Sequence, residues 1–112
     1  MPAKEQFGVW RYVFEDKGEH SVVLISHPDR CVRADSVNVL YCTSQRQNRK
    51  PYPFEVMLNG EDGFDWETFC NCSIMFAVKS ADLFGYRGHV ILERRRKIRV
   101  LIRELFRLSA TD

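Results

Sequence analysis

The chain has 112 residues, 45% hydrophobic and 29% charged, and its 17 Lys and Arg against 15 Asp and Glu leave a formal net charge of +2. This length fits one domain spanning residues 1–112, and the 12% aromatic content argues against disorder. No apolar run approaches the roughly 18 residues of a membrane-spanning helix, and the N-terminal residues lack a secretory signal pattern. We therefore expect a cytoplasmic domain with no membrane partner.

The first half of the chain predicts short strands in a hairpin-like series. Residues 8–14 alternate, with Val9 on one side and Trp10 on the other, and residues 15–18 form a turn signal. Residues 20–26 are a continuous apolar run, which indicates a strand buried on both faces. A further strand is predicted over 37–43, and the polar, basic residues 44–53 are expected to form a loop.

The second half predicts further strands and then one helix. Residues 54–58 alternate and end in an Asn-Gly turn, and residues 67–72 and 74–78 predict two short strands, or one broken near Asn71. Between about residues 92 and 108, five apolar residues recur at helical spacing: Ile98, Leu101, Ile102, Leu105 and Phe106. The pattern as a whole predicts a mainly β fold, a small β-barrel or sandwich over about 7–80 with a C-terminal α-helix.

Two features leave a functional and an ordinary interpretation open. Residues 93–107 hold seven Lys and Arg against two Glu, so this helix presents a basic face that is either solvated or binds nucleic acid. Cys70 and Cys72 would share one face of a strand, and Cys42 or His27 could complete a metal site with them. The ordinary interpretation is reduced, buried thiols, and we expect no metal and no cofactor.

Hydroxyl and basic residues gather where the predicted strand over 37–43 ends. Hydroxyls can donate hydrogen bonds to a phosphate that arginines neutralise, and a tyrosine ring can stack an unpaired base. The alternative is a polar hairpin loop whose rings pack into the core. The candidate substrate-binding residues are Ser44, Gln45, Arg46, Arg49 and Tyr52.

His20 and Thr43 are the candidate catalytic residues; the local sequence indicates His20, and a family resemblance adds Thr43. Without a metal, RNA is cleaved when its own 2′-hydroxyl attacks the adjacent phosphate, and this needs proton transfer and a positive group on the developing charge. His20 follows a tight turn and can transfer a proton near neutral pH; otherwise it is an ordinary histidine at the start of a strand. The acidic residues 61–67 are expected to form a solvated loop rather than a carboxylate site.

Several of these segments together resemble the MazF/PemK family of toxins. The resemblance rests on VLYCTSQ at 39–45 and PYPFEV at 51–56, and on GVW at 8–10, VVLIS at 22–26 and the segment 88–93. It implies an SH3-like small β-barrel with a C-terminal α-helix, in the CcdB/MazF-like superfamily, that acts as a homodimer. It also implies the toxin of a type II toxin–antitoxin system: a metal-independent, sequence-specific endoribonuclease that cleaves single-stranded RNA and is blocked by a cognate antitoxin.

The resemblance also implies roles for two residues. His20 stands where family members carry an Arg at the start of the second strand, and Thr43 stands at the hydroxyl position that ends the third. The Arg-Pro pair of the family is His20-Ser21 here, and because a histidine does not reproduce an arginine fork, Arg11, Arg46 or Arg49 would have to compensate. Two alternatives stay open: a catalytically inactive barrel that binds nucleic acid or a protein partner, and a gyrase-inhibiting toxin.

Overall fold

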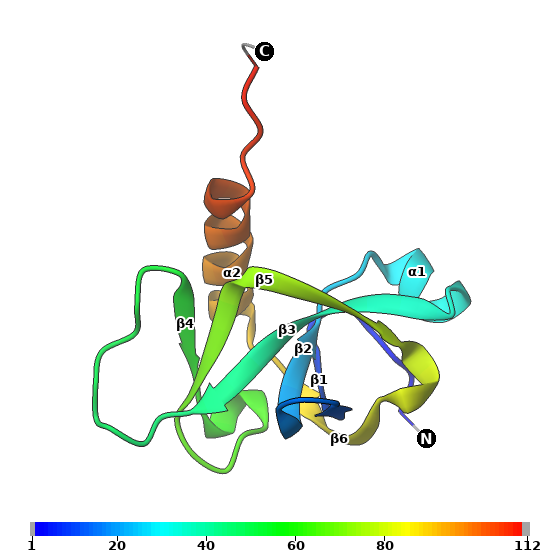
Figure 1. Cartoon of the computed structure of the whole chain (residues 1–112), viewed down its shortest axis with the longest axis horizontal. Helices are drawn as coiled ribbons and strands as arrows, with labels where there is room; N and C mark the ends of the chain where they lie inside the picture. The colour runs from blue at the N-terminus through cyan, green and yellow to red at the C-terminus, as the bar shows by residue number, and fades with distance from the viewer. Residues whose placement is uncertain (1, 111–112) are drawn as a thin grey trace.

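The computed structural model describes residues 2–110, which form one antiparallel six-stranded sheet with strand order β4-β5-β3-β2-β1-β6. The strands are β1 (Gly8–Phe14), β2 (Gly18–Leu24), β3 (Ser36–Ser44), β4 (Glu55–Leu58), β5 (Thr68–Lys79) and β6 (Phe84–His89). The helices are α1 (Pro28–Arg33) and α2 (Leu92–Leu105), with 3₁₀ turns η1 (Gly60–Asp62) and η2 (Ser80–Asp82). The sheet curls into a half-barrel, and α2 extends from one side of it (Figure 1).

The curl of the sheet buries both faces of its central strands. Val23 and Leu40 belong to one hydrophobic cluster, whereas Trp10, Val22 and Val39 belong to a second cluster on the other face. Val22 and Val23 are neighbours in sequence, and both are fully buried. The continuous apolar run over 20–26 is therefore explained by burial on two sides, as predicted.

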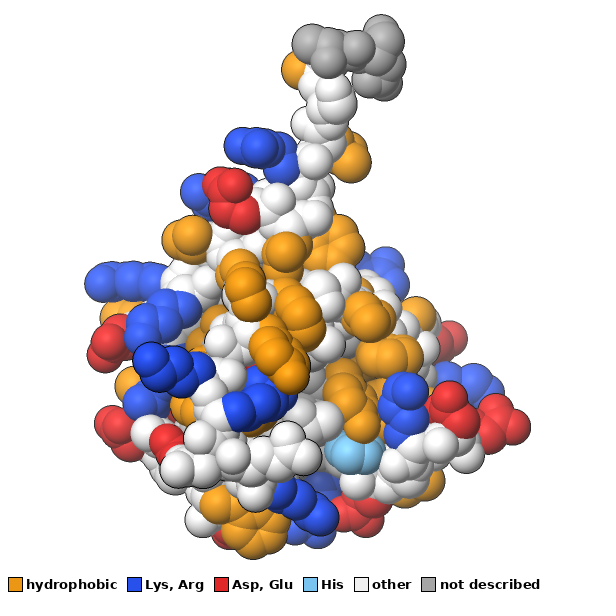
Figure 2. All heavy atoms as spheres, turned by 60° about the vertical axis from the view of Figure 1, so that its left-hand side comes forward, with side chains coloured by type: hydrophobic (Ala, Val, Ile, Leu, Met, Phe, Trp, Pro, Cys, Tyr) orange, Lys and Arg blue, Asp and Glu red, His pale blue; other side chains and the backbone are white. Residues whose placement is uncertain are grey.

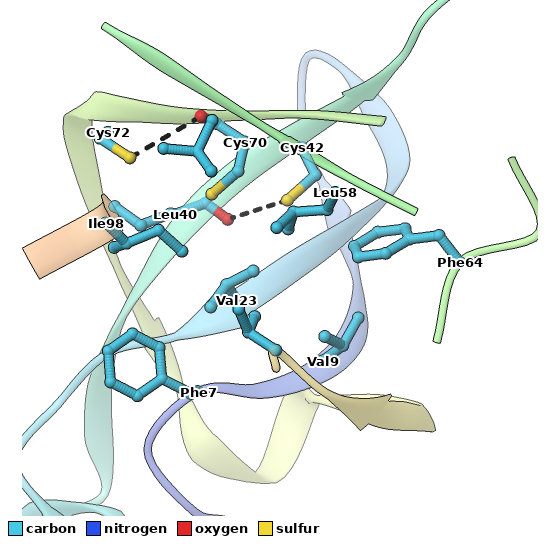
Figure 3. Packing of buried hydrophobic residues seen from close by; sticks show 12 residues of the cluster. Phe7, Val9, Val23, Leu40, Cys42, Leu58, Phe64, Cys70, Cys72 and Ile98 are labelled. Atoms are coloured by element: carbon cyan, nitrogen blue, oxygen red, sulfur yellow. Dashed lines mark hydrogen bonds between the residues drawn. The ribbon is translucent and has the colours of Figure 1, made fainter. Parts of the chain in front are cut away.

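The first cluster joins α2 to the sheet and contains three of the four cysteines. Ile98 of α2 and Phe64 of the β4–β5 loop point into it, and Cys42, Cys70 and Cys72 line it (Figure 3). Hydrogen bonding between neighbouring thiols, together with burial, raises the pKa of Cys70 and of Cys72, so both stay protonated. Within residues 2–110 no group of three or more His, Cys, Asp or Glu is arranged to hold a metal ion.

Three elements differ from the sequence prediction. β5 is one strand of 12 residues, not two, and it continues through Asn71. The polar stretch after β2 contains the short helix α1, because Pro28 begins it and the ring of His27 accepts a hydrogen bond from the Asp29 amide at 3.1 Å. α2 ends at Leu105, three residues before the predicted end.

A further strand, β6, was not predicted. Its sequence has glycines at 85 and 88 and no apolar alternation, so it carries no local strand signal. It forms because it pairs with β1, with Gly8 opposite His89 and Arg11 opposite Phe84 across an irregularity. Long-range pairing decides this strand, not local propensity.

The expectation of a solvated acidic loop over 61–67 is wrong at its centre. The side chain of Asp62 is fully buried, and Arg94 of α2 lies 3.0 Å from its Oδ2. The same carboxylate accepts hydrogen bonds from the amides of Asn59 and Ile91, at 2.9 and 2.8 Å. The carboxylate therefore joins the β4–β5 loop to the N-terminus of α2, where the helix dipole favours a negative charge.

The mainly β fold with a C-terminal helix is confirmed. β4 and β6 are the two edges of the sheet, and the Asp62 contacts bridge the gap between the β4–β5 loop and the segment after β6. In the part of the chain that the structure describes, no helix combines the length and apolarity needed to cross a membrane.

Candidate functional site

A pocket of about 590 Å³ lies at the end of the sheet where β1, β2 and β3 meet the β4–β5 loop. Four of the predicted site residues line it: His20, Thr43, Ser44 and Arg46. Two further arginines, Arg11 of β1 and Arg87 of β6, also face this pocket, as does Trp66 of the β4–β5 loop.

Strand register brings the two predicted catalytic residues to the same place. β2 pairs with β3 from Leu24 opposite Val39 to Val22 opposite Tyr41, and His20 and Thr43 lie beyond that end of the paired residues, where both line the pocket. β1 pairs on the other side, with Tyr12 opposite His20. The pairing of these two strands, which α1 separates in the sequence, therefore brings the imidazole and the hydroxyl to the same pocket.

The ring of His20 is held through both of its nitrogens. Nδ1 lies 3.2 Å from the carbonyl oxygen of Cys42 and donates to it in the tautomer that carries the proton on Nδ1. Nε2 lies 3.1 Å from the carbonyl oxygen of Lys17 and 3.0 Å from the hydroxyl of Tyr41. A neutral ring accepts from Tyr41 at Nε2, whereas a protonated ring donates to Lys17.

Tyr41 is suited to the role of proton donor to this ring. Burial, and to a lesser extent the charge of Asp16, raises the pKa of Tyr41, so its hydroxyl stays protonated. The two rings also pack, with centroids 4.6 Å apart. His20 and Tyr41 therefore form a coupled pair at the edge of the pocket.

The pocket presents donors that no other residue uses. The hydroxyls of Thr43 and Ser21 and the guanidinium of Arg46 line the cavity, and none of them bonds to another described side chain or backbone group. Side-chain hydroxyls and an unpaired guanidinium are the groups that bind a phosphate oxygen directly. A ligand phosphate would not have to displace a protein partner from any of them.

The two other arginines share their charge with carboxylates of the pocket. Arg11 lies 3.5 Å from Glu19, a loose contact between partly exposed groups. Arg87 lies 2.6 Å from Asp65 and also donates to the Gly63 carbonyl at 3.0 Å. Arg11 is the more easily recruited to a phosphate because its existing contact is the longer one.

Trp66 is held in place at the mouth of the pocket. Its indole Nε1 donates to the Ser44 hydroxyl at 2.6 Å, and its carbonyl accepts from the Thr68 hydroxyl at 3.0 Å. The side chain is nevertheless 60% exposed. An exposed, fixed aromatic ring thus adjoins the unpaired donors of the pocket.

Gln45, Arg49 and Tyr52 do not line this pocket. Arg49 makes two hydrogen bonds to the carboxylate of Glu55, at 2.8 and 3.1 Å, and its guanidinium lies 3.9 Å from the ring centroids of both Tyr52 and Phe69. The side chain of Gln45 accepts from a backbone amide within its own loop. These residues give the β3–β4 loop its shape, and a role in substrate binding stays a prediction for each of them.

The ion pair of this loop depends on protonation. Burial alone would raise the pKa of Glu55, but the hydrogen bonds and charge of Arg49 and the Tyr52 amide outweigh it and hold the pKa below its ordinary value. The hydrogen bond to Glu55 in turn raises the pKa of Arg49. The pair is therefore fully charged at neutral pH.

The sequence did not indicate Trp66 and Arg87 as pocket residues, nor Tyr41 as the partner of the His20 ring. Tyr41 lies inside a strand motif and Arg87 lies in the strand that was not predicted, so neither carried a local signal. Trp66 did carry one, because a tryptophan within an acidic, polar loop has no obvious apolar surface to cover. The basic residues of α2 do not line this pocket. Their binding of nucleic acid stays a prediction.

The comparisons with known proteins bear on the fold. No protein-family model and no curated protein matches the sequence. A mycobacterial endoribonuclease in complex with its cognate antitoxin matches the structure with a TM-score of 0.77 at 18% identity, covering 97% of this chain and 98% of that chain. Toxin MazF-mt6 of Mycobacterium tuberculosis matches with a TM-score of 0.73 at 14% identity, covering 88% and 97%.

A MazE–MazF structure (Form-I) from Deinococcus radiodurans also matches, with a TM-score of 0.75 at 12% identity, covering 96% of this chain and 100% of that chain. Identities this low establish the fold alone. The chain has the fold of the MazF-type toxins over nearly its whole length, and the resemblance found in the sequence is confirmed at that level.

Proposed function

We propose that the protein is the toxin of a type II toxin–antitoxin pair and cleaves single-stranded RNA in the pocket between His20 and Arg46, without a metal ion. The proposal joins two independent supports, the MazF-type fold and the chemistry of the pocket. As such a toxin it acts in the cytoplasm, where cellular RNA is found.

The single observation that carries the proposal is the set of unpaired donors beside His20. The side chains of Thr43 and Arg46 have no partner within residues 2–110, and they line the same pocket as Arg11, whose ion pair with Glu19 is long. A phosphate bound there gains a hydroxyl donor and two cations without breaking a strong contact. Stabilising charge on a phosphate is the main demand of phosphodiester cleavage.

The reaction needs no external reactant. The 2′-oxygen of one nucleotide forms a bond to the adjacent phosphorus, and the bond from phosphorus to the 5′-oxygen of the next nucleotide breaks. Nε2 of neutral His20 accepts the proton of the 2′-hydroxyl, and a second proton, from the Tyr41 hydroxyl or water, goes to the leaving 5′-oxygen. The products carry a 2′,3′-cyclic phosphate and a free 5′-hydroxyl.

The test is cleavage of a mixed-sequence RNA by pure protein in EDTA, with the termini of the products identified. We expect His20→Ala and Thr43→Ala to lower the rate by about 100-fold or more and to relieve growth arrest on induction. His27→Ala, which removes an exposed histidine directly before α1, is the matched control and should cleave at the wild-type rate. If both pocket variants cleave RNA and arrest growth as the wild type does, the assignment of the site is wrong.

A second candidate function is a barrel that binds RNA without cutting it. The observation that favours it is the engagement of both His20 nitrogens with protein groups, since a general base must first release the Tyr41 contact. The same assay separates the two functions. A shifted but intact RNA in EDTA would support the binder, and a cyclic phosphate terminus would support the enzyme.

The proposal includes a homodimer and a cognate antitoxin as partners. Lys and Arg side chains surround a group of hydrophobic side chains on the face that carries β4 and α2 (Figure 2), and Val100, Leu105 and Phe106 of this region are exposed. Val100→Asp should convert the dimer to a monomer in analytical ultracentrifugation, whereas Val32→Asp, at a valine of α1 that is also exposed, should not. We expect a small open reading frame directly upstream of the gene to encode the antitoxin, and its co-expression should restore growth.

A further inference from the structure

We propose that Trp66 stacks one unpaired RNA base at the mouth of the pocket and thereby selects where the strand is cut. The inference rests on the proposed function, because it names how the substrate is held in the same pocket. It assigns the recognition of a base to the β4–β5 loop, which the sequence presents only as acidic.

The ring of Trp66 is exposed, but the contacts on both sides of it hold it in place. Phe64, two residues earlier in the same loop, is buried in the first cluster, and Asp65 is paired with Arg87. Thr68 begins β5 and donates to the carbonyl of Trp66. The loop is thus fixed on both sides of an indole that remains 60% exposed. A fixed aromatic ring loses little conformational freedom when a ligand stacks on it.

Only the apolar face of the Trp66 indole remains available to a ligand. Its one polar atom, Nε1, already donates to Ser44 at 2.6 Å. The ring therefore has no hydrogen bond to offer and presents only its apolar face. A flat face next to cations suits a nucleobase, since every base has a π-face and carries its phosphate nearby.

The phosphate-binding groups line the same pocket as Trp66. Ser44, which holds the indole, follows Thr43 directly in β3, and Arg46 lies two residues further on; all three line the pocket that Trp66 also lines. One nucleotide can therefore place its base on Trp66 and its phosphate against Thr43 and Arg46. A base that stacks on Trp66 in the same pocket as the scissile phosphate determines which nucleotide stands at the cut.

Tyr52 is the alternative stacking residue that the sequence favours, and its surroundings differ. It is 50% exposed, but Arg49 lies 3.9 Å from its ring centroid and covers one face. Tyr52 also lies outside the pocket lining. The aromatic ring best placed to meet a base bound at Thr43 is therefore that of Trp66.

The binding test uses tryptophan fluorescence. The chain has two tryptophans, and Trp10 is only 2% exposed, so a stacked base should quench mainly Trp66. The probe is a short mixed-sequence RNA with 2′-O-methyl groups throughout, which cannot be cleaved. We expect saturable quenching in the wild type and its loss in Trp66→Phe, which keeps a stacking ring and should bind within about threefold of the wild type.

Trp66→Ala should weaken binding of the same RNA by about 5- to 150-fold, the range for loss of one base–aromatic stack. Because the Trp66 ring is largely exposed, the thermal unfolding of the Trp66→Ala protein should match that of the wild type. Ser44→Ala, which keeps the ring and removes its hydrogen bond, should retain the quenching.

The decisive experiment tests whether the Trp66 ring contacts one particular base of the RNA. Cut sites are first mapped on a cleavable RNA, and each base flanking the cut is then replaced in turn by an abasic nucleotide. One replacement should weaken binding to the wild type by at least fivefold and leave binding to Trp66→Ala unchanged, and Trp66→Ala should cut at a broader set of sites.

If Trp66→Ala binds and cuts as the wild type does, at the same sites, the stacking role is overturned and the nuclease proposal stands. If the wild type neither binds nor cuts RNA, the nuclease proposal fails, and the stacking role fails with it. If the wild type binds RNA without cutting it, the quenching and abasic-substitution results on the uncleaved strand decide the stacking role alone.

Discussion

Two loops flank the pocket, and their sequences suggest the opposite of what each contributes. The β3–β4 loop is basic, yet Arg49 is taken up by Glu55 and two aromatic rings. The β4–β5 loop is acidic, yet it buries one carboxylate under α2 and extends Trp66 into the pocket mouth. The net charge of a segment therefore does not determine which of its groups face a ligand. What determines this is whether each charged side chain already has a partner within the protein.

The largest expected effect is on the buried carboxylate of the acidic loop. Asp62→Ala should destabilise the protein by about 3–5 kcal/mol, because it leaves Arg94 and the Ile91 amide without their partner. Urea unfolding followed by fluorescence measures this. Glu61→Ala removes an exposed carboxylate from the same loop, 3.4 Å from Arg94, and should cost less than about 1 kcal/mol. Equal costs would show that burial is not what distinguishes the two residues.

The next largest expected effect concerns the close packing of the acidic loop against β6. Gly63 has φ of +101° and a Cβ there would collide with the carbonyl of Arg87, so Gly63→Ala should cost about 1–3 kcal/mol and displace the loop. Gly60→Ala is the matched control, since its Cβ would meet open space. Denaturant midpoints compare the two, and RNA cleavage by Gly63→Ala should fall as Trp66 moves. A neutral Gly63→Ala would contradict the close packing of this loop on β6.

The third prediction separates the two arginines of the basic loop. Arg46→Ala should weaken RNA binding and reduce the slope of log affinity against log salt by about 1, because it removes one phosphate contact. Arg49→Ala should leave this slope unchanged and lower the melting temperature instead. Fluorescence titrations at several salt concentrations measure both slopes. A reduced slope for Arg49→Ala alone would mean that the loop rearranges to present it to RNA.

The smallest effect concerns pH. The pKa of Glu55 is lowered in the folded protein, so its contribution to stability is present above the unfolded-state pKa and is lost as the pH falls through the folded-state pKa. The melting temperature of wild type should exceed that of Glu55→Gln by a few degrees at pH 7, and the difference should disappear in the acid range. A constant difference between pH 7 and pH 3 would show that the loop does not depend on this ion pair.

Much of the sheet could be predicted because its signals are local. β1 alternates with the predicted bounds of Gly8–Phe14, and the double burial of Val22 and Val23 follows from a continuous apolar run. His20 and Thr43 share a pocket because β2 and β3 pair in antiparallel, and the strand signals that predict this pairing are themselves local. β6 has no such signal, because pairing with β1 creates it.

The parts of the site that could not be predicted depend on contacts far apart in the sequence. Arg87 reaches the pocket from the unpredicted strand, and Asp62 is buried by residues about 30 positions later in the chain. Arg49 was assigned to substrate because its carboxylate partner, Glu55, lies across the loop in β4. Residue type and spacing give the inventory of charged groups, whereas the fold decides which of them neutralise one another.

The incomplete closure of the sheet has a consequence for its dynamics. β4 and β6 are edge strands, and near them the Asp62 carboxylate joins the β4–β5 loop to the segment after β6 and to α2, where a closed barrel would have a ladder of backbone hydrogen bonds between the two edges. Amide hydrogen exchange should therefore be fastest along this seam and slowest in β2 and β3. An opening confined to the seam would swing the β4–β5 loop outward while the hairpin that carries His20 stays folded.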